Sequence, residues 1–207
     1  MVPLILASSS PRRALLLREA KFPAEVVHPE VAELSCDFLT ASELARLNAK
    51  IKAAAVAAAY PDAVILGADT VVALGAEIFG KPKDLVDAAR ILQRLAGKTH
   101  EVITGVALME GRGGRITLRA VSSAVTLRSL SNDEIHAYFK DVNPLDKAGA
   151  YAAQHSANAI VERIDGSFTN VVGLPMELIG SLLPSVGIHP SSADRALFPL
   201  TGNGTVS

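Results

Sequence analysis

The sequence begins to define its fold in the stretch PLILASSSPRR, which occupies residues 3–13. Residues 3–7 form a continuous apolar run, which is typical of a short buried strand, and the three serines after it predict a loop. Ser10 followed by Pro11 fits an N-cap and a first helical position, so we expect a helix up to about Ala20. The chain therefore opens with a strand, a loop and an arginine-bearing helix.

The segments that follow first alternate between strands and helices and then pair as strands. A capping box at 40–43 precedes an alanine-rich helix to about residue 59, and a second capping box starts a helix over 131–140. The other expected elements are strands at 25–28, 63–67, 100–109 and 115–127, a hairpin over 71–79, and helices at 85–95 and 175–183. This order favours a mixed α/β fold, with helices flanking a twisted sheet and a cleft dividing two lobes.

Length and composition limit the class of protein. The 207 residues are 49% apolar, and 20 basic against 21 acidic side chains give a net charge of −1, so no global positive field exists to hold a nucleic acid polymer. The single Cys36 excludes a disulfide framework and a multi-cysteine zinc site. No apolar run approaches the ~20 residues of a membrane span, and we expect a cytoplasmic protein. Residues 1–184 are expected to form one domain with two lobes, and 185–207 a poorly ordered C-terminal tail.

The serine-rich loop and the two arginines after it are the strongest candidate for ligand binding. A strand end, a hydroxyl-rich loop and a helix N-terminus supply backbone N–H groups and a positive dipole, and Arg12 and Arg13 add charge. This combination suits a phosphate group. An ordinary capped helix start with exposed arginines explains the same residues.

Four charged residues elsewhere are candidates for the chemistry. Asp69 follows a buried strand, and a carboxylate at a strand end can bind Mg²⁺ and orient or deprotonate water; an Asx-type cap is the alternative. Glu33, on a loop, is a candidate metal ligand or a solvated side chain. Lys81, on a short rigid turn, and Lys52, on the alanine-rich helix, can reach a phosphate, although lysines are mostly surface residues.

The segment DKAGAY at 146–151, with Gln154 after it, joins small residues to an amide that can read a base edge. A tight packing turn is the alternative interpretation. The five histidines have no metal-ligand spacing, so we interpret them, like Cys36, as structural.

Taken together, six ordered motifs resemble the Maf family of nucleoside triphosphate pyrophosphatases. They are SSSPRR at 8–13, GADTVV at 67–72, GKP at 80–82, GKTH at 97–100, DKAGAY at 146–151 and GLP at 173–175. Each motif is ordinary by itself, but the ordered set over about residues 4–183 is specific.

The resemblance implies an elongated α/β fold similar to that of inosine triphosphate pyrophosphatases, with the site in a central cleft. It also implies cleavage between the α- and β-phosphates of a nucleotide with a divalent metal, which we expect to be Mg²⁺ or Mn²⁺, and a homodimer. Housecleaning of modified nucleotides and control of ordinary nucleotide pools are the two roles that such an activity can serve. Asp69 matches the family's proton acceptor, and Glu33 matches its acidic metal-site residue. The positions near the phosphates are matched by Ser8, Arg13, Lys52 and Lys81.

Three further positions, Arg12, Thr70 and Gln154, match those linked to base choice in the family. Arg12 with Gln154 resembles the branch that hydrolyses dTTP and UTP, because a neutral amide offers both a donor and an acceptor to the O4/N3 edge of uracil or thymine. Modified pyrimidine nucleotides are further candidate substrates. The alternatives are a 7-methyl-GTP pyrophosphatase, a phosphatase that releases the γ-phosphate, and a nucleotide-binding regulator of septum formation.

This chain departs from the family pattern in two places. Ala152, Ala153 and His155 stand in a loop that usually carries glycines, which affects substrate range and loop closure. Around Asn48 the helix also differs, and matching Lys52 to the family lysine requires a shift of one residue.

Overall fold

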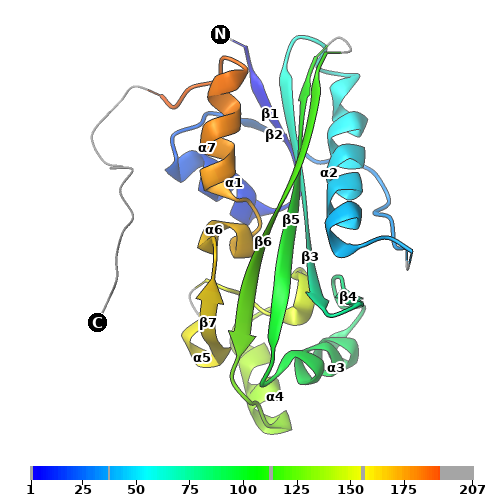
Figure 1. The fold of residues 1–207 in the computed structure, drawn as a ribbon. Helices are drawn as coiled ribbons and strands as arrows, with labels where there is room; N and C mark the ends of the chain where they lie inside the picture. The colour runs from blue at the N-terminus through cyan, green and yellow to red at the C-terminus, as the bar shows by residue number, and fades with distance from the viewer. Residues whose placement is uncertain (1, 37, 112–113, 155–156, 192–207) are drawn as a thin grey trace.

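A computed structural model describes residues 2–36, 38–111, 114–154 and 157–191. In this part of the chain a seven-stranded mixed sheet extends along an elongated molecule (Figure 1). The strands are β1 (Leu4–Ala7), β2 (Glu25–Val27), β3 (Val64–Leu74), β4 (Glu77–Phe79), β5 (Thr99–Glu110), β6 (Ile116–Leu127) and β7 (Val161–Asp165). Their order is β2-β1-β3-β5-β6-β7, and β4 pairs with β3 outside this path. β1 is parallel to β2 and β3, whereas the other pairs are antiparallel.

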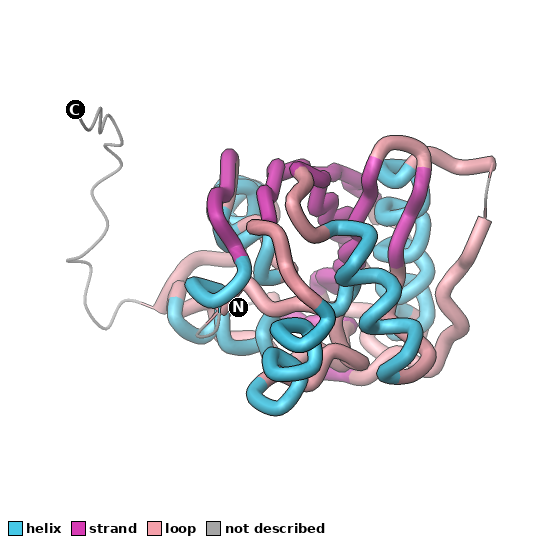
Figure 2. The backbone as a smooth tube through the Cα atoms, turned by 90° about the horizontal axis from the view of Figure 1, so that it is seen from below, coloured by secondary structure: helices cyan, strands magenta, loops and turns pink. Residues whose placement is uncertain are grey.

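Helices flank this sheet on both faces, as the view from below in Figure 2 also shows. They are α1 (Pro11–Glu19), α2 (Ala41–Ala57), α3 (Leu85–Leu95), α4 (Asn132–Asp141), α5 (Ala157–Ile160), α6 (Phe168–Val172) and α7 (Met176–Ser185), with a 3₁₀ turn η1 (Ala148–Ala150). At one end of the molecule α1 and α7 cover one sheet face and α2 covers the other; α3 and α4 lie at the opposite end (Figure 1). The expected mixed α/β fold is confirmed.

The same long strands contribute to the cores of both lobes. In β3, Leu66 packs in the core with α1 and α7, while Val72 packs in the core with α3 and α4. In β5, Val106 packs in the core with α1 and α7, and Val102 packs in the core with α3 and α4. The strands therefore pass from one lobe to the other between these positions, and the lobes share one sheet.

Helix α2 lies unusually close to the sheet because glycines face it. A Cβ atom at Gly67 would lie 2.3 Å from the Ala49 carbonyl oxygen, and one at Gly105 would lie 2.3 Å from that of Ala45. Ala45 and Ala49 are fully buried in this contact. Small residues on both sides thus set the depth at which α2 packs.

The local expectations agree with the structure for most elements, including both capping boxes. One expectation is wrong: the strand expected at 63–67 continues to Leu74, so Asp69 lies within β3 and not at its end. The polar pair Asp69 and Thr70 does not end the strand because its ladder with β5 continues on both sides. β7, α5 and α6 are additional elements.

Residues near the C-terminus pack on the first lobe. Ile188 is buried in the core with α1 and α7, and the Ser191 amide donates to the Lys21 carbonyl at 2.8 Å. Of the expected tail at 185–207, residues 192–207 lie outside the described residues. None of the helices in the described residues is both long and apolar enough to cross a membrane.

Candidate active site

A cleft of about 810 Å³ lies where the long strands pass from one lobe to the other. It brings together all nine candidate residues, which come from segments far apart in the sequence. These lining residues are Ser8, Arg12, Arg13, Glu33, Lys52, Asp69, Thr70, Lys81 and Gln154.

A lysine between two carboxylates forms one side of the cleft. Lys52 Nζ donates to Asp69 Oδ1 at 2.5 Å and to Glu33 Oε1 at 2.7 Å, and Lys81 Nζ lies 3.8 Å from the same Glu33 oxygen. Lys52 and Asp69 are buried, whereas Lys81 is exposed. Burial acts to raise the pKa of Glu33, but the hydrogen bond and charge of Lys52, with Lys81 and Arg13, outweigh burial and hold this pKa below its ordinary value.

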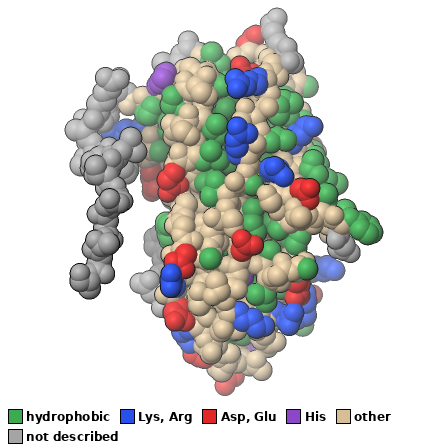
Figure 3. Space-filling view, in the orientation of Figure 1, with side chains coloured by type: hydrophobic (Ala, Val, Ile, Leu, Met, Phe, Trp, Pro, Cys, Tyr) green, Lys and Arg blue, Asp and Glu red, His purple; other side chains and the backbone are tan. Residues whose placement is uncertain are grey.

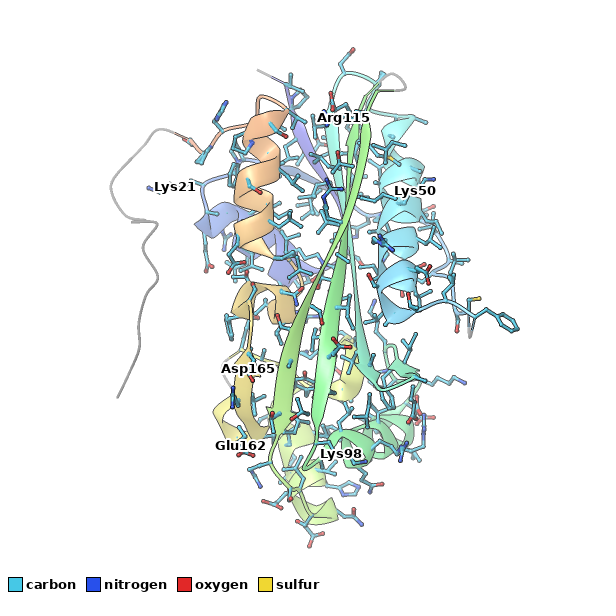
Figure 4. The ribbon with its side chains drawn as sticks, in the orientation of Figure 1. Lys21, Lys50, Lys98, Arg115, Glu162 and Asp165 are labelled. Atoms are coloured by element: carbon cyan, nitrogen blue, oxygen red, sulfur yellow. The ribbon has the colours of Figure 1, made fainter. Side chains whose placement is uncertain are left out.

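The position of Lys52 on α2 explains why this lysine is buried. Lys50, two residues earlier, lies on the outer side of the helix (Figure 4). Successive helix residues are about 100° apart, so two residues separate the inner face from the outer face. The close packing of α2 on the glycines of β3 and β5 then brings Lys52 to Asp69.

The loop that carries Glu33 is anchored by Asn48. The Leu34 amide donates to Asn48 Oδ1 at 2.7 Å, and Asn48 Nδ2 donates to the Leu34 carbonyl at 3.2 Å. Asn48 and Lys52 are four residues apart and share one face of α2. In the sequence, Asn48 stands out only as a departure from the family pattern, because a residue that anchors a distant loop has no local sequence signal.

Arg13 forms the opposite side of the cleft and is buried as a cation. Its guanidinium donates to the Gly173 carbonyl at 2.7 Å, to Thr70 Oγ1 at 3.0 Å and to Ser8 Oγ at 3.2 Å. Among the described residues, no carboxylate lies within ion-pair distance of it. Burial lowers the pKa of Arg13 and Asp69 acts in the opposite direction, but an arginine stays charged in a protein.

The N-terminus of α1 adjoins Arg13. Ser10 occupies the expected N-cap position, but its side chain makes no capping hydrogen bond, and its amide donates to Ser8 Oγ at 3.1 Å. The amides of the first helical turn therefore lack a side-chain cap. Together with the helix dipole, they favour an anion at this end of the cleft.

Arg12 connects α1 to the segment before η1. Its guanidinium donates to Asp146 Oδ2 at 3.0 Å and to the Asp146 carbonyl at 3.2 Å, while Lys147 Nζ lies 2.5 Å from Asp146 Oδ1. Burial acts to raise the pKa of Asp146, but Lys147 and Arg12 outweigh it and lower this pKa. Gln154, half-buried, lines the same cavity as Arg12 and Thr70.

The charges of the cleft differ from those of the whole chain. Five cations and four carboxylates line it, namely Arg12, Arg13, Lys52, Lys81, Lys147, Glu33, Asp69, Glu77 and Asp146. Figure 3 shows both signs of charge spread over one face of the molecule. The cleft thus gathers charges of both signs, with one more cation than carboxylate, in a chain of net charge −1.

The carboxylates of the cleft suit a divalent metal that also has substrate phosphates as ligands. No group of three or more His, Cys, Asp or Glu side chains suited to a metal occurs in the described ranges. Glu33 and Asp69 are two carboxylates that share one cation, Lys52. Mg²⁺ is commonly held by one or two carboxylates together with substrate phosphates, so the residues fit a metal that binds with its nucleotide.

The described histidines lie away from the cleft, whereas the cysteine lines it. His100 is buried and bonds the Tyr151 hydroxyl through Nε2 at 2.7 Å; none of the described histidines lines the cleft. His155 lies outside the described residues. Cys36 is a free thiol that lines the cleft.

Comparison with known proteins identifies the family of the chain. The family model described as "Maf-like protein" matches residues 3–186. The chain is 43% identical over 185 residues to a dTTP/UTP pyrophosphatase of Dictyoglomus turgidum, covering 89% of this chain and 96% of that protein. It is also 43% identical over 187 residues to a dTTP/UTP pyrophosphatase of Symbiobacterium thermophilum, covering 90% and 95%.

A solved structure shares the fold. The Ham1 protein of Staphylococcus aureus superposes with a TM-score of 0.51 at 14% sequence identity, covering 89% of this chain and 99% of that chain. At this identity the similarity concerns the fold alone.

Proposed function

Because the chain belongs to the Maf-like protein family, we propose that it hydrolyses dTTP and UTP to the nucleoside monophosphate and pyrophosphate. One observation carries this proposal. A buried guanidinium, which pairs with no carboxylate of the described residues, faces across one cleft a cluster formed by the buried Asp69 and Lys52 and the exposed Glu33. The guanidinium suits an anionic phosphate chain, and the cluster suits the activation of a water molecule beside that chain. The names of the relatives at 43% identity support the same activity.

Arg13 and the start of α1 are the groups that would hold the phosphates. Phosphoryl-type transfer needs mainly positioning and neutralisation of charge on the departing oxygens. Arg13 is fixed by its three neutral acceptors, and Lys81, which is exposed, adds a further cation. These cations would stabilise the negative charge that develops on pyrophosphate as it leaves.

Asp69 would orient the attacking water and accept its proton. The water oxygen forms a bond to the α-phosphorus, and the bond from that phosphorus to the bridging oxygen breaks, so that pyrophosphate departs with the bonding electrons. Lys52 fixes the position of the Asp69 carboxylate through the bond at 2.5 Å. Its second bond, to Glu33, keeps both carboxylates at one wall of the cleft.

Glu33 and Asp69 would hold Mg²⁺ or Mn²⁺, whose charge, when bound, offsets that of the triphosphate oxygens. The two carboxylates suit this purpose because each has one oxygen bonded to Lys52, while its second oxygen makes no hydrogen bond within the described residues.

Arg12, Thr70 and Gln154 would select the base. The Gln154 amide presents a donor and an acceptor, which matches the N3–H and O4 groups of uracil and thymine. Arg12 is held by Asp146, between α1 and the segment before η1, and lines the same cleft as Gln154. The neutral amide of Gln154 supports a pyrimidine over a cationic 7-methylguanine, which a carboxylate would suit better.

A panel of nucleotides tests the proposal. dTTP, UTP, dCTP, dATP, GTP, 7-methyl-GTP and modified pyrimidine triphosphates are incubated with Mg²⁺, with Mn²⁺ or with EDTA. Monophosphate, pyrophosphate and orthophosphate are then quantified. We expect dTTP and UTP to yield equal amounts of monophosphate and pyrophosphate only with metal.

Three results would contradict the proposal in different ways. Release of orthophosphate with a diphosphate product would identify a phosphatase. Preference for 7-methyl-GTP would overturn the assignment of Gln154. Binding of dTTP without turnover under any metal condition would indicate a nucleotide-binding regulator.

A further inference from the structure

A closed ring of five hydrogen bonds holds the Arg13 guanidinium at the cleft. Arg13 Nη2 donates to Thr70 Oγ1 at 3.0 Å, and the hydroxyls of Thr70 and Thr104 lie 2.9 Å apart. Thr104 Oγ1 donates to the Asn170 carbonyl at 3.0 Å, and this carbonyl also accepts from the Gly173 amide at 3.0 Å. The ring closes where Arg13 Nε donates to the Gly173 carbonyl at 2.7 Å.

The Asn170 carbonyl fixes the direction of the two hydroxyl bonds. A carbonyl oxygen only accepts, so the Thr104 proton is directed to Asn170. Thr70 must then donate its own proton to Thr104, and it accepts from Arg13. Thr70 therefore has no proton for a ligand, and its position relative to Arg13 depends on Thr104.

The far side of the ring is rigid because Asn170 is anchored to the sheet. Asn170 is fully buried, and its Nδ2 donates to the Val102 carbonyl and to Ser123 Oγ, each at 2.9 Å. Its backbone amide donates to Ser167 Oγ at 3.1 Å. These bonds to β5, β6 and the start of α6 hold the acceptor of Thr104 in place.

We propose that Thr104 is a positioning residue of the active site, which orients Thr70 and, through Thr70, Arg13 for phosphate binding. Thr104 is fully buried and is not among the residues that line the cleft, so it acts through its neighbours. This proposal rests on the proposed function in one respect, namely that the bound phosphates are those of a nucleoside triphosphate. The ring itself is a property of the fold.

The ring leaves Arg13 able to bind a phosphate with two donors. A guanidinium has five N–H groups, and three of them bond Gly173, Thr70 and Ser8. Within the described residues, one N–H on each terminal nitrogen remains. Two such donors in one plane can form a bidentate pair with a phosphate, provided that the plane is held.

Thr104→Val tests this role because it removes the hydroxyl and preserves the shape of the side chain. We expect the variant to bind inorganic pyrophosphate about tenfold more weakly, which corresponds to the loss of one oriented hydrogen bond. With dTTP, kcat/KM should fall by a similar factor. Thr104→Ser restores the hydroxyl and should recover most of the affinity, and Thr104→Ala gives the same comparison if the valine variant folds poorly.

Thr99→Val is the matched control. Thr99 also lies on β5, and its hydroxyl lies 2.9 Å from that of Thr126 on the neighbouring strand, but it is exposed and does not line the cleft. It should leave pyrophosphate affinity unchanged. A weakening equal to that of Thr104→Val would show a general effect of the strand and would overturn the proposal.

The double variant Thr70→Val/Thr104→Val separates positioning from simple destabilisation. If Thr104 acts through Thr70, the double variant should bind pyrophosphate as weakly as Thr70→Val alone. Additive losses, or wild-type affinity in Thr104→Val, would overturn the proposal. Because pyrophosphate binding needs no turnover, these outcomes are distinct from a wild-type protein that fails to cleave dTTP, which would overturn only the proposed function.

Discussion

Lys52 is the residue on which the geometry of one cleft wall depends. It is buried with Asp69 and joins this carboxylate to Glu33 through two short hydrogen bonds. A buried charge that loses its partner is strongly destabilising, whereas an exposed charge contributes little. The two lysines of α2, one buried and one exposed, provide a direct comparison.

Lys52→Met should lower both activity and stability. Removal of the ammonium leaves Asp69 buried without its cation, which costs roughly 3 kcal/mol of unfolding free energy, and displaces Glu33. We expect dTTP turnover to fall at least about 100-fold. Lys50→Met, on the outer side of α2, is the control for enzyme assays and urea unfolding. Equal effects of the two substitutions would contradict the assigned geometry.

Asp69→Asn tests the carboxylate itself. The amide has nearly the same shape but cannot accept the proton of the attacking water, so turnover should fall about 10³-fold. The fold should persist, as checked by circular dichroism. Asp165→Asn, on the exposed strand β7, is the control. Near-normal activity in a folded Asp69→Asn protein would remove Asp69 from its role.

His100 makes stability depend on pH. Burial lowers its pKa to about 4 from 6.5, so between these values the unfolded chain binds more protons and stability falls as the pH falls. The contribution lost between pH 7.5 and 5 is about 2 kcal/mol, measurable by urea unfolding. His100→Gln should flatten this dependence, while His136→Gln, an exposed control, should retain it. An unchanged slope in His100→Gln would refute the assignment.

The packing of α2 on the sheet is the decisive contact at the scale of elements. Two glycines of neighbouring strands accept the backbone of the helix, and alanines supply the helix surface. An interface of this kind has no flexible side chain that can move aside. The depth of the helix, and with it the reach of Lys52, is therefore fixed by the absence of Cβ atoms.

Gly105→Ala should force α2 away from the sheet. The new Cβ would lie 2.3 Å from the Ala45 carbonyl oxygen, so we expect a loss of about 2 kcal/mol and reduced dTTP turnover. Gly180→Ala is the matched control, because no atom lies within 4 Å of its Cβ and it is in helix α7, where alanine should stabilise by about 0.5–1 kcal/mol. Thermal unfolding of the two variants measures both changes in stability. A neutral Gly105→Ala would show that α2 can shift freely.

The elements were more predictable from the sequence than their contacts. Apolar runs, capping boxes and glycine turns are local signals, and they locate β1, α1, α2, α3 and the β5–β6 hairpin correctly. The extent of β3 was mistaken because polar residues normally end a buried run. Here Asp69 finds its partner on α2, and Thr70 finds its partners on α1 and β5, so the strand continues.

The site was predictable only as a set of residues. Lys52 and Lys81 have no local signal that separates them from surface lysines, and only the family resemblance assigns them to positions near the phosphates. The bonds from Arg13 to Gly173 and from Arg12 to Asp146 join residues 160 and 134 positions apart, which no local pattern encodes. Asn48, Thr104 and Asn170 were missed for the same reason, since each acts by holding another residue.

The two lobes of the whole molecule share the strands β3, β5 and β6 without a linker between them. We therefore expect one cooperative unfolding transition, with equal calorimetric and van't Hoff enthalpies. Differential scanning calorimetry checks this. Two transitions that separate with heating rate or with added pyrophosphate would contradict a shared sheet as the source of stability.

Arg13 carries its charge into the interior, and the acceptors of its hydrogen bonds in the described part of the chain are all neutral. The free protein tolerates this arrangement at a cost in stability, and an incoming anion relieves it. Stability and activity therefore make opposite demands on this residue. An apolar side chain in its place, or a new carboxylate beside it, would stabilise the ligand-free protein and lower its affinity for phosphates. Efforts to make this protein thermostable should therefore begin at positions remote from the cleft, such as Gly180, and leave Arg13 unchanged.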